Sequence, residues 1–188
     1  MGKQSWKPGN MLYPLPAVLV SVADRQGHTN LFTVAWAGTV CSDPPMVSIS
    51  VRPERYSYHM IEETNEFVIN LTTEELCYAT DFCGVRSGRD LDKWKETHLT
   101  KVTGDIVGAP LIAQSPVNLE CQVVEKKDLG THTMFLAKVV AVHADERFID
   151  DKNRFHLDQA KPIVYSHGTY FAVGKSLGTF GYSVKKRK

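Results

Sequence analysis

Between residues 51 and 57 the chain gathers side chains that can bind an anion. This segment, VRPERYS, holds Arg52, Arg55, Tyr56 and Ser57 around a turn that Pro53 constrains. Guanidinium groups form short, charge-assisted hydrogen bonds with phosphate oxygens, and the hydroxyl groups add further hydrogen-bonding capacity. These residue types at this spacing therefore favour a phosphate-binding turn.

Each of these residues also has a purely structural interpretation. Arg52 and Arg55 can be solvated residues of an ordinary turn. Ser57 can be the N-cap of a short helix, which we expect over residues 57–63. A helix N-terminus also attracts anions, so capping and phosphate binding are compatible at Ser57.

Two predicted strands position this turn. Residues 30–36, NLFTVAW, are rich in β-branched and aromatic side chains, and residues 46–51, MVSISV, alternate apolar and polar side chains as a half-buried strand does. Asp43, Pro44 and Pro45 force a break between them. We therefore expect the chemistry in the stretch from residue 30 to residue 58.

Composition limits the classes of function. A chain of 188 residues with 43% hydrophobic content can bury a core. Its length predicts one domain that spans residues 1–188. The net charge of +1 gives no global field for nucleic acid or an anionic membrane, so a charged ligand must be bound locally. The N-terminal sequence contains no apolar run long enough for a signal peptide or a membrane span.

The cysteines and histidines show no pattern of a disulfide framework or a metal site. The four cysteines include no CxxC pair, which indicates reduced thiols in a cytoplasmic protein. The histidines show no HxH or HExxH spacing, so no metal site is expected.

The rest of the chain predicts a mainly β protein with short helices. About seven strands without βαβ alternation favour a barrel over a doubly wound sheet. A Thr72/Glu75 capping box predicts a helix to about Phe82 with Gly84 to end it, and Ser87 with Asp90 predicts a single further turn. The other expected elements are an extended arm (1–16), strands at 17–23, 66–71, 162–165 and 169–173, a strand around 119–123 with one solvated face, a strand at 133–143 covered on both faces, and a solvated basic tail (185–188).

Several segments together resemble the flavin reductase-like, FMN-binding split-barrel proteins, and within them the flavoredoxin-like group. The resemblance rests on the order and spacing of short anchors that extend from about Tyr13 to Gly174. These anchors are NLFTVAW (30–36), DPP before VSISV (43–51), RYS (55–57), EFVINL (66–71), DFCG (81–84) with SGR (87–89), and GTH (130–132).

The resemblance implies a Greek-key split β-barrel, a homodimer, and FMN as the cofactor. It implies an oxidoreductase that passes electrons from NADH or NADPH through FMN to a flavin, a ferric complex or a redox protein. The end of the strand at 33–36 would offer backbone groups to the ring edge, Trp36 would be either an aromatic wall or plain core, and the turn would bind the phosphate. The expected FMN-binding residues are Asn30, Thr33, Val34, Ala35, Trp36, Ser50, Val51, Arg52, Arg55, Tyr56, Ser57, Cys83 and Lys93.

His132 is the candidate catalytic residue. Many flavin reductases that this chain resembles carry Gly-Asp-His at this place, where the histidine is associated with the nicotinamide. This chain has Gly130-Thr131-His132, which lacks the acidic residue and puts nicotinamide use in question. His132 can equally be a structural residue, and the alternative function is an FMN-binding electron-transfer module without nicotinamide activity. A third alternative is a split barrel that binds haem or pyridoxal phosphate.

The segment from 82 to 93 leaves two interpretations open. Arg86, Arg89 and Lys93 form either an exposed basic face or the remainder of the phosphate site, and we favour the second role for Lys93. Cys83 either contacts the flavin or fills space in the core.

Overall fold

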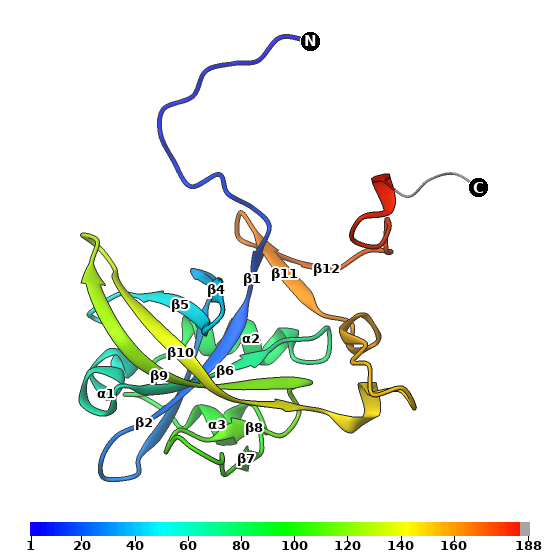
Figure 1. Ribbon diagram of the computed structural model, residues 1–188. Helices are drawn as coiled ribbons and strands as arrows, with labels where there is room; N and C mark the ends of the chain where they lie inside the picture. The colour runs from blue at the N-terminus through cyan, green and yellow to red at the C-terminus, as the bar shows by residue number, and fades with distance from the viewer. Residues whose placement is uncertain (185–188) are drawn as a thin grey trace.

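The computed structural model describes residues 1–184; the predicted basic tail at 185–188 lies outside the described residues. Its centre is a seven-stranded antiparallel sheet with the order β3-β2-β6-β9-β10-β5-β4 (Figure 1). The strands are β2 (Val18–Ala23), β3 (Thr29–Val34), β4 (Ala37–Ser42), β5 (Pro45–Val51), β6 (Glu66–Leu71), β9 (Val117–Asp128) and β10 (Thr133–Ala144).

The sheet curls because its two edges are neighbours in the sequence. Only Ala35 and Trp36 separate β3 from β4, and three residue steps of extended chain span at most about 11 Å. The edges must therefore meet at that end of the sheet. The backbone N–H of Ser50 donates to the carbonyl of Trp36 at 2.8 Å and fixes this junction against β5.

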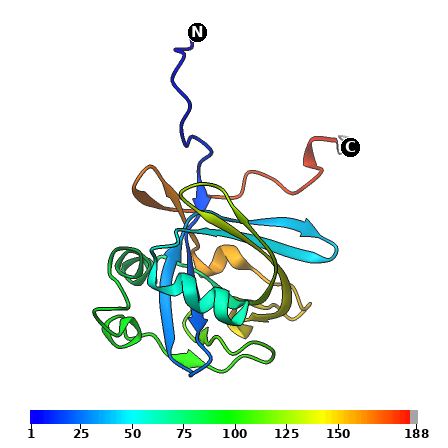
Figure 2. The ribbon, with the colours of Figure 1, turned by 90° about the vertical axis from the view of Figure 1, so that its left-hand side faces the viewer.

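The interior of the curled sheet is the main core. Alternate residues of β5, namely Val47, Ile49 and Val51, point inward, as do Phe67 of β6 and Phe135 of β10. Helix α1 (Tyr56–Thr64) adds Tyr58, Met60 and Ile61 to the same core, and Figure 2 shows it lying against the strands.

The remaining elements lie around this sheet. Helix α2 (Cys77–Val85) and the short α3 (Lys93–Glu96) share a second core cluster with Leu19 of β2 and Leu31 of β3. A small sheet pairs β1 (Leu15–Pro16), β11 (Ile163–Ser166) and β12 (Thr169–Ala172). The chain is completed by β7 (Lys101–Val102), β8 (Leu111–Ile112) and the 3₁₀ turns η1 (Glu146–Phe148), η2 (Leu157–Ala160) and η3 (Tyr182–Val184).

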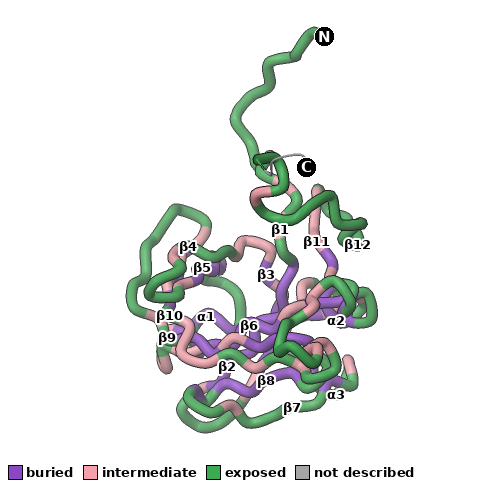
Figure 3. Tube along the Cα trace, turned by 45° about the vertical axis from the view of Figure 1, so that its right-hand side comes forward, coloured by how far each residue is buried: buried purple, intermediate pink, exposed green. Residues whose placement is uncertain are grey.

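Most predicted strands are confirmed to within two residues at each end, including the β2–β3 hairpin, β6 and the β11–β12 hairpin. The extended arm is also confirmed, apart from the two residues of β1, and Figure 3 shows it leaving the body as an exposed segment. Strand β4 was not predicted. No helix within residues 1–184 is both long and apolar enough to cross a membrane.

The helix caps predicted at Ser57 and Thr72 are wrong, whereas Ser87 does begin a single turn, in which its hydroxyl accepts from the Arg89 N–H at 3.2 Å. Helix α1 begins at Tyr56, so Ser57 lies inside its first turn and Arg55 is the N-cap residue, without a side-chain cap bond. The capping box at Thr72 does not form, because the Thr72 hydroxyl donates to the carbonyl of Ala17 instead. Helix α3 is capped by Asp92, whose side chain accepts from the N–H groups of Trp94 and Lys95.

Helix α2 also ends later than predicted. It continues through Gly84 to Val85, and the chain then becomes extended at Arg86. A Cβ atom at Gly84 would lie 3.3 Å from Cβ of Thr33, so the glycine allows α2 to approach β3 closely.

Two predictions about strand faces are wrong. Alternation in the strand expected around 119–123 puts Glu120 and Gln122 on its solvated face, but the Glu120 side chain is 0% exposed because the loop at 105–107 folds over it. Strand β10 was expected to be covered on both faces, yet its second half is not, and Lys138 and Val142 are exposed. The register shifts between β9 and β10 interrupt regular alternation there.

Candidate functional site

A cavity of about 370 Å³ lies where β3, the β5–α1 turn and the segment after α2 come together. Its walls carry the cationic side chains of Arg52, Arg55, Arg86, Arg89 and Lys93, with Glu54 as the acidic residue among the lining residues. We call it the cationic cavity. The remaining lining residues are Asn30, Phe32, Tyr56, Ser57, Val85, Ser87 and Gly88.

Strand β3 and helix α1 meet at one wall of the cationic cavity. The side-chain amide of Asn30 donates a hydrogen bond of 2.8 Å to the hydroxyl oxygen of Ser57. The segment after α2 approaches the same amide, because a Cβ atom at Gly88 would lie only 2.3 Å from Oδ1 of Asn30. Glycine at position 88 is therefore what lets this segment close the cavity.

The arginines are held in part by backbone carbonyls. Nη1 of Arg55 donates to the carbonyl of Gly84 at 3.1 Å. The Arg89 guanidinium donates to the carbonyl of Glu54 and lies over the Tyr56 ring at 5.7 Å. Arg52 instead pairs with the carboxylate of Glu54 at 3.5 Å. Arg89 reaches the turn from the segment after α2. These contacts orient the guanidinium groups and leave donors for an anion.

Lys93 reaches the cationic cavity from α3. The side chain is buried, 3% exposed, and Nζ donates to the carbonyls of Leu31 and Cys83, each at 2.8 Å. Burial lowers the pKa of Lys93 to about 8, with the Cys83 thiol opposing this shift and the charge of Arg55 adding to it. The ammonium therefore keeps most of its charge at neutral pH.

A second cavity of about 190 Å³ adjoins the first and shares Phe32, Arg52 and Arg55 with it. Its walls are the end of β3, the β3–β4 junction, the end of β5 and two aromatic residues from other segments. We call it the ring cavity, after the aromatic rings that line it. The lining residues beyond those shared are Thr33, Val34, Ala35, Trp36, Ser50, Val51, His132 and Tyr165.

His132 and Trp36 face each other in the ring cavity, with ring centroids 6.5 Å apart. Nδ1 of His132 lies 2.9 Å from the hydroxyl of Thr131. Burial, followed by the positive charge of Arg52, lowers the pKa of His132 below its ordinary value, although Glu54 opposes the shift. This shift favours the neutral imidazole, which has one donor and one acceptor nitrogen.

The structure brings nearly all of the predicted site residues together. Of the expected set, Asn30, Tyr56, Ser57 and Lys93 line the cationic cavity. The expected residues at 33–36, 50 and 51, with His132, line the ring cavity, and Arg52 and Arg55 line both. Cys83 lines neither cavity; its side chain is buried in the cluster between α2 and α3.

Sequence reasoning missed six lining residues and left Arg86 and Arg89 undecided. The six are Phe32, Glu54, Val85, Ser87, Gly88 and Tyr165. The signal for the segment after α2 was its density of glycine and arginine in GVRSGR. No local signal identifies Tyr165, because it reaches the ring cavity from β11, more than 100 residues beyond the predicted stretch.

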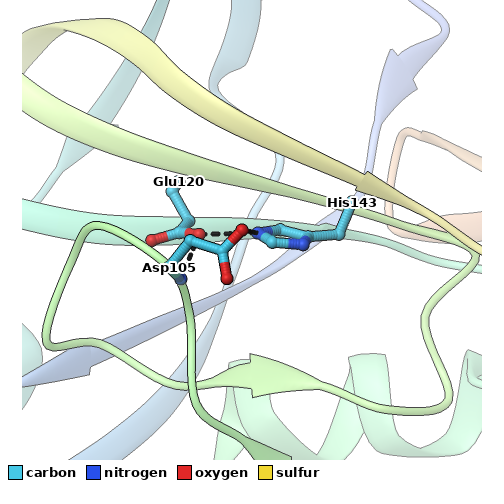
Figure 4. A group of neighbouring side chains, drawn as sticks. All are labelled: Asp105, Glu120 and His143. Atoms are coloured by element: carbon cyan, nitrogen blue, oxygen red, sulfur yellow. Dashed lines mark hydrogen bonds and ion pairs between the residues drawn. The ribbon is translucent and has the colours of Figure 1, made fainter.

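A separate cluster contains exposed Asp105, buried Glu120 and half-buried His143 (Figure 4). The Glu120 carboxylate accepts backbone N–H bonds from Asp105, Ile106 and Val107 at 2.7 to 2.8 Å, and Oε1 lies 2.6 Å from Nε2 of His143. Four donors already occupy its two oxygens, which makes Glu120 a clamp for the loop at 105–107. The spacing rules that led us to expect no metal site could not foresee this cluster.

The fold is similar to that of known flavoredoxins over nearly the whole chain. The flavoredoxin of Desulfovibrio vulgaris (Miyazaki F) superimposes with a TM-score of 0.91 at 30% identity, covering 98% of this chain and 100% of that one. The flavoredoxin of Methanosarcina acetivorans gives 0.86 at 26% identity, covering 97% and 100%. These neighbours confirm the split-barrel fold.

Sequence relatives and a family profile agree. A protein of Aeropyrum pernix is 32% identical over 156 residues, which are 82% of this chain but only 58% of that protein. The profile of the flavin reductase-like domain matches residues 11–174. The chain therefore belongs to the flavin reductase-like domain family.

Proposed function

We propose that the chain binds FMN and passes electrons from NADH or NADPH through it to a flavin, a ferric complex or a redox protein. The observation that carries this proposal is the junction of a cationic cavity with a smaller cavity lined by backbone and aromatic groups. Family membership and the similarity to flavoredoxins support the same function.

The lining residues fit the two ends of FMN. A phosphate monoester carries up to two negative charges, and the cationic cavity offers four arginines and Lys93 against one carboxylate. The close approach of Gly88 to Asn30 keeps this cavity narrow, as a phosphate site requires. The ring cavity contains the end of β3, where backbone groups are no longer used by the sheet.

Each group has a defined task in this proposal. Arg52, Arg55 and Ser57 bind the phosphate, while Lys93 adds charge from the buried side. Trp36 forms an aromatic wall for the flat ring, and His132, beside Trp36 in the same cavity, offers a hydrogen bond to the nicotinamide substrate. Bound FMN supplies the reversible electron transfer that no side chain of the protein can provide.

A second candidate function is an FMN-binding electron-transfer module that does not react with nicotinamides. The hydroxyl of Thr131 favours it, because it contacts Nδ1 of His132 where related reductases have an acidic side chain. An acidic neighbour would stabilise a charged imidazole, whereas a hydroxyl does not.

Mixing the FMN-loaded protein with NADH or NADPH in the absence of oxygen separates the two functions. Rapid loss of the yellow colour supports the reductase, and unchanged absorbance supports the transfer module.

We further propose that the chain is a single domain, acts as a homodimer and works in the cytoplasm. Sedimentation equilibrium of the FMN-loaded protein tests the dimer directly.

A further inference from the structure

A third cavity, of about 550 Å³, lies between the N-terminal arm and the hairpin of β4 and β5. The arm contributes residues 9–13 and Leu15, and the hairpin side contributes Trp36, Ala37, Gly38, Ser48 and Ser50. We call it the arm slot. Its volume falls in the range of small-molecule sites, about 300 to 1,000 Å³.

The floor of the arm slot is the outer face of β5 and β4. Because side chains alternate along a strand, Val47, Ile49 and Val51 enter the core while Ser48 and Ser50 point outward. Gly38 pairs with Ser48 across the hairpin. A Cβ atom at Gly38 would meet nothing within 4 Å, so small residues leave a flat, open shelf.

The arm is anchored at one end of the slot. Leu15 pairs with Tyr165 in the small sheet, and the ring of Tyr13 lies 4.1 Å from that of His167. Beyond this anchor Met11 and Leu12 are 58% and 85% exposed, so the arm presents apolar side chains along the shelf.

The arm slot lies next to the ring cavity. Both cavities are lined by Trp36 and Ser50, and the hydrogen bond from the Ser50 N–H to the Trp36 carbonyl holds these two residues together. A molecule on the shelf would therefore lie beside the ring of Trp36 and next to the proposed position of the flavin.

The chemistry of the arm slot contrasts with that of the cationic cavity. None of the residues that line the slot carries a charge, and its polar groups are the Asn10 amide, the Tyr13 hydroxyl and the serine hydroxyls. Such a lining offers no charged partner to a phosphorylated nucleotide or a charged metal chelate. It suits a flat, uncharged ring with oxygen atoms that accept hydrogen bonds.

We propose that the arm slot binds a small uncharged quinone, as a further electron acceptor besides those of the proposed function. The inference rests on the proposed function, which supplies two electrons beside the slot, and a quinone is a small, uncharged, planar molecule that accepts two electrons. In the overall reaction one NADH or NADPH and one proton convert one quinone to its hydroquinone. Two electrons leave the nicotinamide, and both enter the quinone.

Quinone binding is measured apart from turnover, with duroquinone as the probe. All four of its ring positions carry methyl groups, so cysteine thiols cannot add to it. Ligand-observed NMR of its methyl signal gives its dissociation constant for the oxidised FMN-loaded protein and for the ligand-free protein. Anthraquinone-2,6-disulfonate serves as the planar anionic comparison.

Two variants test the location. Gly38→Leu fills the open shelf and should weaken duroquinone binding at least tenfold, while FMN affinity stays unchanged. Thr39→Leu is the matched control, since Thr39 is the next residue of β4, is exposed and does not line the slot. Leu12→Glu, on the exposed arm, adds a charge without disturbing the core and should weaken duroquinone binding as well.

The proposal is overturned if Gly38→Leu and Leu12→Glu bind duroquinone as the wild type does, or if the disulfonate binds as tightly as duroquinone. It is also overturned if Gly38→Leu alters only the sedimentation mass, which would make the slot a contact between copies of the chain. Failure to bind FMN would refute the proposed function separately, since duroquinone binding is also measured without FMN.

Discussion

The side-chain amide of Asn30 donates a hydrogen bond of 2.8 Å to the hydroxyl of Ser57, which joins strand β3 to helix α1. Both residues are buried. The segment after α2 reaches the same amide at Gly88. Three segments that are distant in the sequence thus meet at one side chain, and the cationic cavity lies between them.

Gly88→Ala should weaken FMN binding by roughly tenfold or more. The added Cβ atom would lie 2.3 Å from Oδ1 of Asn30, so either the segment or the Asn30–Ser57 bond must shift. Gly174→Ala is the control, because a Cβ atom there meets nothing within 4 Å. Titration of ligand-free protein with FMN, followed by flavin fluorescence, measures the effect. Equal affinities for the two variants would show that the close approach at Gly88 does not shape the site.

Arg55→Ala should reduce FMN affinity roughly 30-fold, about 2 kcal/mol, because a charged hydrogen bond to phosphate is lost. Riboflavin, which lacks the phosphate, should bind the variant and the wild type equally well. Arg25→Ala removes another arginine on the surface, one that pairs with Glu63, and should change neither affinity. If Arg55→Ala binds FMN as the wild type does, Arg55 is not part of the site.

The imidazole of His132 should titrate below the ordinary pKa of histidine. Burial and then Arg52 lower this pKa, since both disfavour the charged form. NMR of the ring protons across pH 4 to 8 locates the midpoint. In Arg52→Ala the midpoint should rise, because the positive charge that disfavours the protonated imidazole is removed. A midpoint at or above about 6.5 in the wild type would contradict the lowered pKa.

Glu120 should make the fold sensitive to acid. Burial by itself raises its pKa, but hydrogen bonds from the Val107 N–H, His143 and the Asp105 and Ile106 N–H groups outweigh burial and lower the pKa to about 2. A carboxyl with a lowered folded-state pKa contributes stability above its unfolded pKa of about 4.3. That contribution is lost as pH falls from this value through about 2.

Glu120→Gln tests this clamp. It should lower the free energy of unfolding at pH 7 by roughly 3 kcal/mol, because an amide cannot accept all the bonds that the carboxylate accepts. It should also remove much of the loss of stability between pH 4.5 and 2. Glu125→Gln, an exposed position on the same strand, should leave both quantities unchanged. Urea unfolding at several pH values provides the measurement, and identical curves for both variants would refute the clamp.

Much of the fold was predictable because its strands carry local signals. Alternation in β5 and the turn residues of the β2–β3 hairpin identify these elements directly. Strand β4 was missed because its sequence, AGTVCS, has neither alternation nor a continuous apolar run. The burial of Glu120 was not predictable either, since it depends on a loop whose own sequence has no clear pattern.

The helix cap at Thr72 was mispredicted for a different reason. Thr72 has the residue type of an N-cap, but its hydroxyl bonds the carbonyl of Ala17, 55 residues away in sequence. The Thr72 hydroxyl thus makes a tertiary hydrogen bond and does not cap the helix. The site was predictable where one continuous stretch supplies it, as at Arg52 and Ser57. Tyr165 and Gly88 come from other elements and needed the fold.

The central claim is that one pair of joined cavities holds the ring and the phosphate of a single FMN. Parallel titrations of ligand-free protein with FMN and with riboflavin, followed by flavin fluorescence, test it most directly. We expect one FMN per chain, bound on the order of 100-fold more tightly than riboflavin, because only FMN carries the group that the cationic cavity would bind. Equal affinity for the two flavins, or no binding of either, would contradict the account.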